Sequence, residues 1–154
     1  MLCRYALLIV SLVSLPAAAA GKLVVDDAWI RAAPPGVRML AGYARLTNAG
    51  DAPLVVTGAT SAAFGDVSLH ASAVEDGVAK MRPLPRLTIA PGATETLAPG
   101  GKHLMLMQPA ATLEVGAKAT ITLTVEGGGD GTAEFVVRDG APEAEGSGHA
   151  HHDH

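Results

Sequence analysis

The fold is decided by the stretch Ala119-Thr-Ile-Thr-Leu-Thr-Val-Glu126, which is followed by the glycine-rich segment 127–131 and the apolar segment 132–138. In the quoted stretch, apolar Ile, Leu and Val alternate with threonines. Successive side chains of a β-strand point to opposite faces, and β-branched residues favour strands. The pattern therefore predicts two antiparallel strands with one buried face each, and we interpret the glycines as their hairpin loop.

Segments of similar character recur at intervals of about ten residues, separated by turn signals rich in Gly, Pro, Asn and Asp. No segment combines an apolar period of about 3.6 residues with helix caps. A series of short strands of this kind predicts a single all-β domain, an antiparallel β-sandwich or barrel. The further strand segments are 22–32 (one or two strands), 39–47, 54–56, 67–74, 78–82, 87–89, 94–97 and 102–108.

Composition excludes several classes of function. The chain has 154 residues, enough for one domain, and a net charge of −4. Nucleic-acid binding needs a basic face, which this charge does not supply. The sequence contains neither a Gly-x-Ser-x-Gly motif nor a phosphate-binding Walker loop, and its carboxylates are scattered at turns. We therefore expect a protein that is not an enzyme.

Residues 1–20 have the features of a secretory signal peptide. One positive charge at Arg4 precedes the apolar run 5–15, and Ala18-x-Ala20 matches a signal-peptidase site. The apolar run is too short to span a bilayer, which disfavours the alternative of an N-terminal membrane anchor. These features predict export to the periplasm, with no insertion into the membrane after the signal is removed.

The predicted mature chain, residues 21–154, contains no cysteine, because Cys3 leaves with the signal peptide. Cys3 also lies too close to the start of the chain to be the lipidated cysteine of a lipoprotein. The domain is therefore expected to fold in an oxidising compartment without disulfides. Any soft metal ion that it binds must use ligands other than thiolate.

Residues 139–154 differ in composition from the domain 21–138. They contain Gly, Ala, Pro and Glu and almost no large apolar side chain, which predicts a flexible tail. Imidazole suits Cu(II), Ni(II) and Zn(II), so we expect the tail to capture Cu(II); the alternative is a solubilising extension. The histidines that would bind this metal are His149, His151, His152 and His154.

A histidine and a methionine are brought together by a predicted hairpin. Asp76-Gly77 is a strong signal for a two-residue turn between the segments 67–74 and 78–82. With this turn, Ser72 lies opposite Met81, and His70 becomes a diagonal neighbour of Met81 on the same face. Diagonal side chains of this length can meet at their tips.

A second histidine and methionine pair follows from alternation in the segment 102–108. If Leu104 and Leu106 fill the core, then His103, Met105 and Met107 point to the outer face or the rim. Two imidazoles and two neutral thioethers would form a site that favours Cu(I) over harder ions. The alternative is that the methionines fill the core, and this applies most to the accessory candidates, Met39 and Met107.

The order His70-x10-Met81-x21-His103-x-Met105 resembles the metal motif of the periplasmic copper chaperone family PCuAC. The segments Asp27–Gly36 and Lys80–Pro83, and Pro99–Met107 around the second pair, are also similar to that family. The resemblance covers about residues 22–138. It implies a cupredoxin-like fold and a Cu(I) site made by His70, Met81, His103 and Met105.

The resemblance also implies a role, which is to carry copper to the copper centres of a haem-copper cytochrome oxidase, with that subunit or a Sco-type protein as partner. One departure is that Ala71 follows His70, where some members have a further Met nearby; this removes no motif ligand. Three other functions stay open. A redox protein with a blue-copper site is disfavoured by the missing cysteine ligand. A scavenger or buffer of zinc, nickel or copper would rely on the tail, and a metal-free scaffold would use neither site.

Overall fold

The computed structural model describes residues 21–140, so the predicted signal peptide and the tail histidines lie outside the described residues. Within this range the chain is all-β, as predicted, and contains no helix that could cross a membrane. The ten strands are β1 (Leu23–Arg31), β2 (Met39–Asn48), β3 (Leu54–Thr60), β4 (Phe64–Glu75), β5 (Val78–Pro83), β6 (Leu87–Ile89), β7 (Thr94–Leu97), β8 (Lys102–Pro109), β9 (Lys118–Val125) and β10 (Gly131–Arg138).

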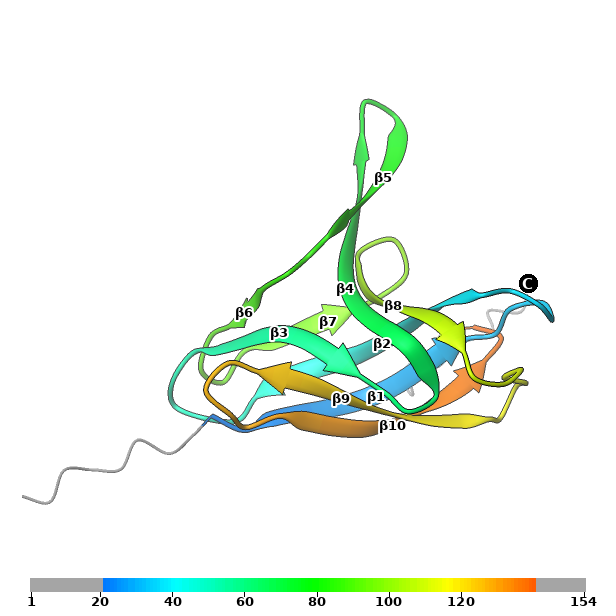
Figure 1. Ribbon diagram of the computed structural model, residues 1–154. Helices are drawn as coiled ribbons and strands as arrows, with labels where there is room; N and C mark the ends of the chain where they lie inside the picture. The colour runs from blue at the N-terminus through cyan, green and yellow to red at the C-terminus, as the bar shows by residue number, and fades with distance from the viewer. Residues whose placement is uncertain (1–20, 141–154) are drawn as a thin grey trace, which may run out of the picture.

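Seven of the strands form a closed barrel (Figure 1). Their order is β4-β8-β2-β1-β10-β9-β3, and the pairing of Ala59 in β3 with Val67 in β4 closes the ring. The short strands β5, β6 and β7 extend it from β4, β3 and β2. All pairings are antiparallel except β1 with β10, which is parallel. The first and last strands of the domain therefore lie side by side.

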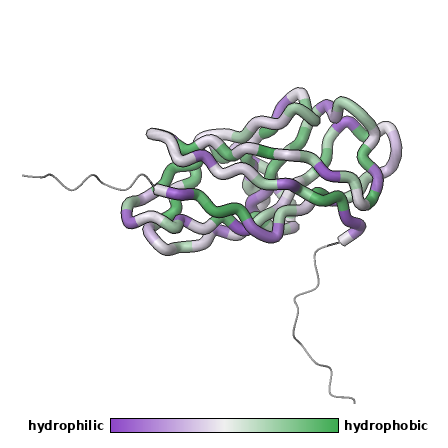
Figure 2. Tube along the Cα trace, turned by 90° about the horizontal axis from the view of Figure 1, so that it is seen from below, coloured by the Kyte–Doolittle hydropathy of each residue, from purple (hydrophilic) through white to green (hydrophobic). Residues whose placement is uncertain are grey.

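The quoted alternation of β9 determines what lies inside the barrel. Ile121 and Leu123 are fully buried, and so are Phe135 and Val137 on the neighbouring β10. The intervening threonines face outward, where Thr122 hydrogen-bonds across the sheet to β10. Figure 2 shows hydrophobic and hydrophilic positions succeeding each other along the strands, as a barrel with one apolar face requires.

Two strands are longer than their local sequence predicts. β3 continues past Val56 to Thr60, and β4 begins at Phe64 rather than Val67. The added residues include Gly58 and Gly65, which have low strand propensity. They are held in strands by pairing with β9 and β8, an effect of tertiary contacts that composition does not show. The segment 22–32 forms a single strand, whose register shifts between Asp26 and Trp29.

The β4–β5 hairpin rises away from the barrel (Figure 1). Its register is the predicted one, with Glu75 opposite Val78 and both turn residues, Asp76 and Gly77, at positive φ. Every residue of β5 is exposed. The hairpin thus projects a two-sided ribbon into solvent, directly above β8.

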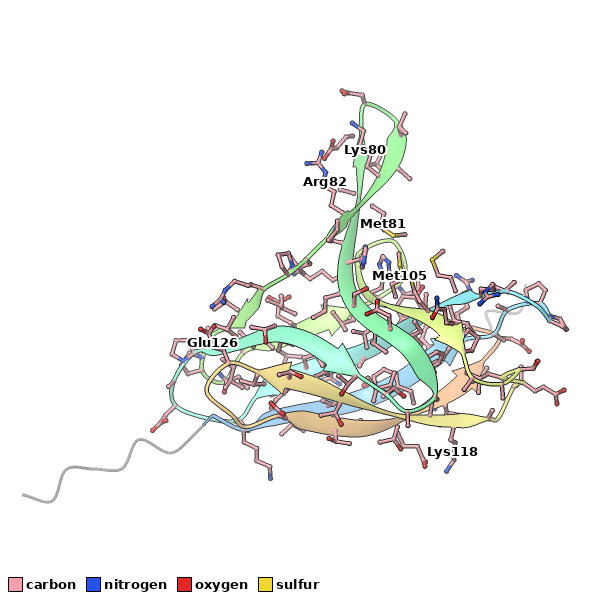
Figure 3. The ribbon with its side chains drawn as sticks, viewed as in Figure 1. Lys80, Met81, Arg82, Met105, Lys118 and Glu126 are labelled. Atoms are coloured by element: carbon pink, nitrogen blue, oxygen red, sulfur yellow. The ribbon has the colours of Figure 1, made fainter. Side chains whose placement is uncertain are left out.

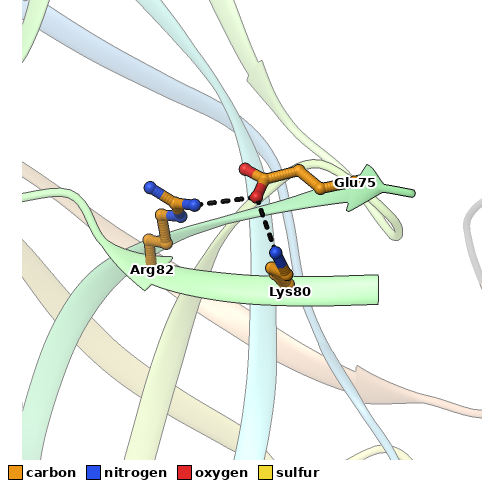
Figure 4. A network of polar contacts seen from close by, with 3 residues as sticks. All are labelled: Glu75, Lys80 and Arg82. Atoms are coloured by element: carbon orange, nitrogen blue, oxygen red, sulfur yellow. Dashed lines mark hydrogen bonds and ion pairs between the residues drawn. The ribbon is translucent and has the colours of Figure 1, made fainter. Parts of the chain in front are cut away.

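One face of this hairpin carries an ion-pair network. Glu75 accepts hydrogen bonds from Lys80 at 3.1 Å and from Arg82 at 2.8 Å (Figure 4). Exposed pairs of this kind stabilise a fold by little. Because the register places Met81 on the opposite face, the charged groups point away from the side that carries the methionine.

Asn48 ties one end of the barrel together. It is fully buried, and its amide donates to the carbonyl oxygens of Ala52 at 2.8 Å and Ile89 at 3.0 Å. Its side-chain oxygen accepts from the backbone N–H of Gly50 at 2.9 Å. The side chain therefore links the end of β2, the following turn and β6.

Replacing Asn48 with Ala should lower the free energy of unfolding by about 2–3 kcal/mol, because the buried carbonyl of Ile89 and the partly buried carbonyl of Ala52 lose their donor. Urea denaturation measures this effect. Thr47→Ala is the matched control, since it removes only an exposed hydroxyl bond to Thr94 and should cost less than about 1 kcal/mol. Equal losses in the two variants would contradict the assigned role of Asn48.

Candidate metal centre

The two histidines of the predicted motif lie directly opposite each other. His70 of β4 pairs with His103 of β8. Their ring centroids are 6.1 Å apart and the planes are inclined by 29°. Directly opposite residues share a face of the sheet, so both imidazoles lie on the outer side of the barrel. The inward positions beside them are taken by the buried Leu69 and Leu104.

The two methionines of the motif flank this pair. Met81 lies opposite Ser72, and Met105 lies opposite Ser68. These serines are two residues from His70 on either side, so both thioethers occupy the same face as the imidazoles. Figure 3 shows Met81 at the base of the hairpin, above Met105 on β8. The structure therefore brings the four predicted residues together on one face of β5, β4 and β8.

Exposure rises from the floor of this cluster to its edge. His103 is 6% exposed, although it points to the outer face, while His70 and Met105 are half-buried. Met81 is 49% exposed. His103 thus lies on the outer face, as alternation predicted, but it is buried there, which alternation alone did not show. The cluster has a buried histidine at its base and a thioether open to solvent at its entrance.

The tautomer of His103 follows from its hydrogen bond. Nδ1 lies 3.1 Å from the carbonyl oxygen of Gly101. A carbonyl can only accept a hydrogen bond, so Nδ1 carries the proton and Nε2 keeps its lone pair. Metal-binding histidines are commonly oriented by a backbone carbonyl in this way.

His70 is oriented by a chain of two polar side chains. Its Nε2 lies 3.2 Å from Oγ of Ser68, and this hydroxyl donates to Asp66 at 3.4 Å. The hydroxyl proton is directed to the carboxylate, so Nε2–H of His70 donates to the hydroxyl oxygen. Nδ1 is then unprotonated, and it is buried without a hydrogen-bond partner. A buried nitrogen lone pair without a partner needs an explanation, and a bound ion supplies one.

The surroundings of His70 also favour its neutral form. Burial lowers the pKa of His70 below its ordinary value, and the nearby His103 lowers it further. The carboxylate of Asp66 acts in the opposite direction and raises the pKa. The net lowering keeps the imidazole unprotonated, as a metal ligand must be.

The donor atoms define which ions this cluster can hold. Two imidazole nitrogens and two thioether sulfurs are neutral, and sulfur is soft, so Cu(I) is favoured over Zn(II), Ca(II) or Mg(II). Among residues 21–140, no three His, Cys, Asp or Glu side chains gather into a site for a harder ion. The assignment of the four residues as copper ligands stays a prediction.

The other predicted ligands divide into two groups. Met39 and Met107 lie on the same outer face as Met105, whereas the tail histidines are outside the described residues.

Sequence reasoning missed the roles of Asp66 and Ser68 in orienting His70. Their spacing of two residues along one strand was the signal, because it places all three side chains on one face.

Comparison with known proteins identifies a matching family and a relative of this chain. The model of the family described as "Putative lipoprotein LpqE-like" matches residues 23–137. The "Putative lipoprotein Lxx21020" of Leifsonia xyli is 36% identical over 125 residues, which cover 80% of this chain and 74% of that protein.

Solved structures of PCuAC domains have the same fold. The copper-bound PCuAC domain from PmoF2 is 29% identical, with a TM-score of 0.64 over 80% of this chain and 97% of that domain. The apo PCuAC domain from PmoF1 is 29% identical, with a TM-score of 0.63 over 80% and 98%. Apo-DR1885 from Deinococcus radiodurans is 30% identical, with a TM-score of 0.58 over 90% and 95%.

Replacing Asp66 with Asn should lower the pKa of His70 further, because the carboxylate that raises it is removed. NMR titration of the ring protons measures this, with Asp51→Asn as the control in a distant turn. In the wild-type protein and in both variants, the pKa of His70 should lie below the ordinary value for histidine.

A lowered folded-state pKa also sets the sign of the effect on stability. The His70 contribution is complete above the ordinary pKa of histidine, and it is lost as the pH falls below that value, where the unfolded chain takes up the proton first. An unchanged titration of His70 in the Asp66→Asn variant would contradict the effect of the Asp66 charge on His70.

Proposed function

We propose that this chain, which belongs to the LpqE-like family and has the fold of PCuAC domains, is a periplasmic copper chaperone. It binds Cu(I) through His70, Met81, His103 and Met105. The observation that carries the proposal is the orphaned Nδ1 of His70, which is buried beside a second imidazole and two thioethers on one face. The copper-bound PCuAC domain of similar fold supports the choice of metal.

Neutral ligands suit the monovalent ion. Two imidazoles and two thioethers carry no negative charge, so they do not compensate the charge of a bound ion. The single charge of Cu(I) tolerates this better than the larger charge of a divalent ion. Thioethers also resist the thiol–disulfide chemistry that would disable a thiolate site in an oxidising compartment. The donor set therefore matches both the ion and the proposed location.

The open entrance favours a carrier over a permanent metal site. Met81 is half exposed on a hairpin that stands clear of the barrel, so a recipient can approach it directly. The ion can pass by exchange of one ligand at a time, without a change in its oxidation state. The proposed recipient is a copper centre of a haem-copper cytochrome oxidase, reached directly or through a Sco-type protein, as the PCuAC resemblance implies.

The tail supports a second role and an alternative function. We propose that His149, His151, His152 and His154 capture Cu(II) near the Cu(I) site, because imidazole nitrogen without sulfur suits the oxidised ion. If these histidines hold most of the metal, the protein would instead be a scavenger of zinc, nickel or copper, or a copper buffer without a delivery partner.

Met81→Ala and Met105→Ala should each weaken Cu(I) binding by at least about tenfold, because each removes one thioether ligand. Competition with a chromophoric Cu(I) chelator measures the affinity. Val78→Ala is the control, since it shortens an exposed side chain on the other face of the hairpin. Loss of the folded state in the methionine variants, in place of lost affinity, would identify these side chains as structural.

Titration of residues 21–139 beside residues 21–154 separates the domain from the tail. Both proteins should bind one Cu(I) tightly, with sulfur and nitrogen neighbours in X-ray absorption, and only the longer chain should bind additional Cu(II). A domain that binds no Cu(I) without its tail would overturn the chaperone function and leave the divalent-metal scavenger.

A further inference from the structure

The outer face that carries the four candidate ligands continues beyond them. On β8, Met107 follows Met105 at a spacing of two and points to the same side. It lies directly opposite Met39 of β2 on one side and Asp66 of β4 on the other. Three chemically distinctive side chains thus form a row across adjacent strands, at the edge of the histidine cluster.

These methionines do not fill the core. The next residue pair in the same register, Leu40 with Leu106, points inward and is buried. Met39 is 48% exposed, Asp66 is exposed and Met107 is half-buried. The pair of thioethers therefore lies at the surface, where solvent and a metal ion can reach both sulfur atoms.

The spacing of the row suits a shared ion. Directly opposite residues of an antiparallel pair have Cβ atoms about 4.5–5.5 Å apart, and the methionine side chain is unbranched with three rotatable bonds in all. A metal–sulfur bond of about 2.3 Å requires two sulfur atoms to approach within about 5 Å. Met39 and Met107 can meet this condition without a change in the backbone. Asp66 supplies a negative charge that balances the charge of Cu(I).

We propose that Met39, Met107 and Asp66 form a second Cu(I) position, from which the ion passes to the principal site. The inference rests on the proposed function of the four-residue site and adds its route of entry. The position lacks an imidazole and is open to solvent, so it binds more weakly than the principal site and releases the ion readily.

The step between the two positions is an exchange of ligands. Residues at a spacing of two along a strand are about 7 Å apart, so Met105 is the next thioether beyond Met107. Cu(I) leaves the sulfur of Met39 as it gains that of Met105, and the imidazoles of His70 and His103 then complete the site. The ion keeps its oxidation state, and no proton or electron is needed.

The test uses the mature chain with its four tail histidines replaced by alanine, so that the tail cannot bind the metal. In this background, Met39→Leu/Met107→Leu removes both sulfur atoms and keeps the apolar volume. Val37→Ala is the matched control, because it alters an exposed apolar side chain beside Met39. Silver(I) replaces Cu(I) in NMR experiments on methyl-labelled methionine, and stopped-flow transfer from a Cu(I) chelator gives the loading rate.

We expect the methyl signals of Met81 and Met105 to shift with the first equivalent of silver, and those of Met39 and Met107 with the second. The double variant should lose the second equivalent and load the first about tenfold more slowly, with its affinity unchanged. Loading and stoichiometry equal to those of the control would overturn the second position alone. Absence of tight binding at Met81 and Met105 in every protein would overturn the proposed function itself.

Discussion

The pairing of β4 with β8 is the constraint on which the rest of the molecule depends. It joins His70 to His103 on the outside and Leu69 to Leu104 on the inside. Because side chains alternate along a strand, a slip of one residue would exchange the two sets and put imidazoles into the core. The core leucines that stabilise the barrel therefore also fix the register of the candidate metal ligands.

Polar groups around the two histidines orient the imidazole rings that the strand register places on one face. The backbone carbonyl of Gly101 accepts a hydrogen bond from one ring nitrogen of His103. The hydroxyl of Ser68, which donates to Asp66, accepts one from a ring nitrogen of His70. The other nitrogen of each ring is left with its lone pair. In the proposed copper site, this arrangement orients the rings before an ion arrives, so that less conformational freedom is lost on binding. The flexible thioethers supply the adaptable half of the site.

Local sequence predicted the parts of the structure that depend on alternation and on one turn. The Asp76-Gly77 signal correctly gave the register of the β4–β5 hairpin, and alternation gave the outward direction of Met105. The all-β class followed from the same pattern. Burial of His103 and the parallel pairing of β1 with β10 did not follow, because both depend on contacts between segments far apart in the chain. The spacing of Asp66, Ser68 and His70 was present in the sequence but had no evident purpose until their hydrogen bonds were seen.

The parallel neighbours β1 and β10 have a consequence for when the protein becomes competent. Trp29 in the first strand pairs with Val136 in the last, so the ring of strands is complete only after nearly the entire domain has been synthesised. Topologies dominated by such distant contacts fold slowly compared with those built from local ones. If the chain is exported unfolded, the barrel is therefore completed only after export. In that case the candidate site on β4, β5 and β8 would first meet a metal ion in the compartment where the barrel is completed.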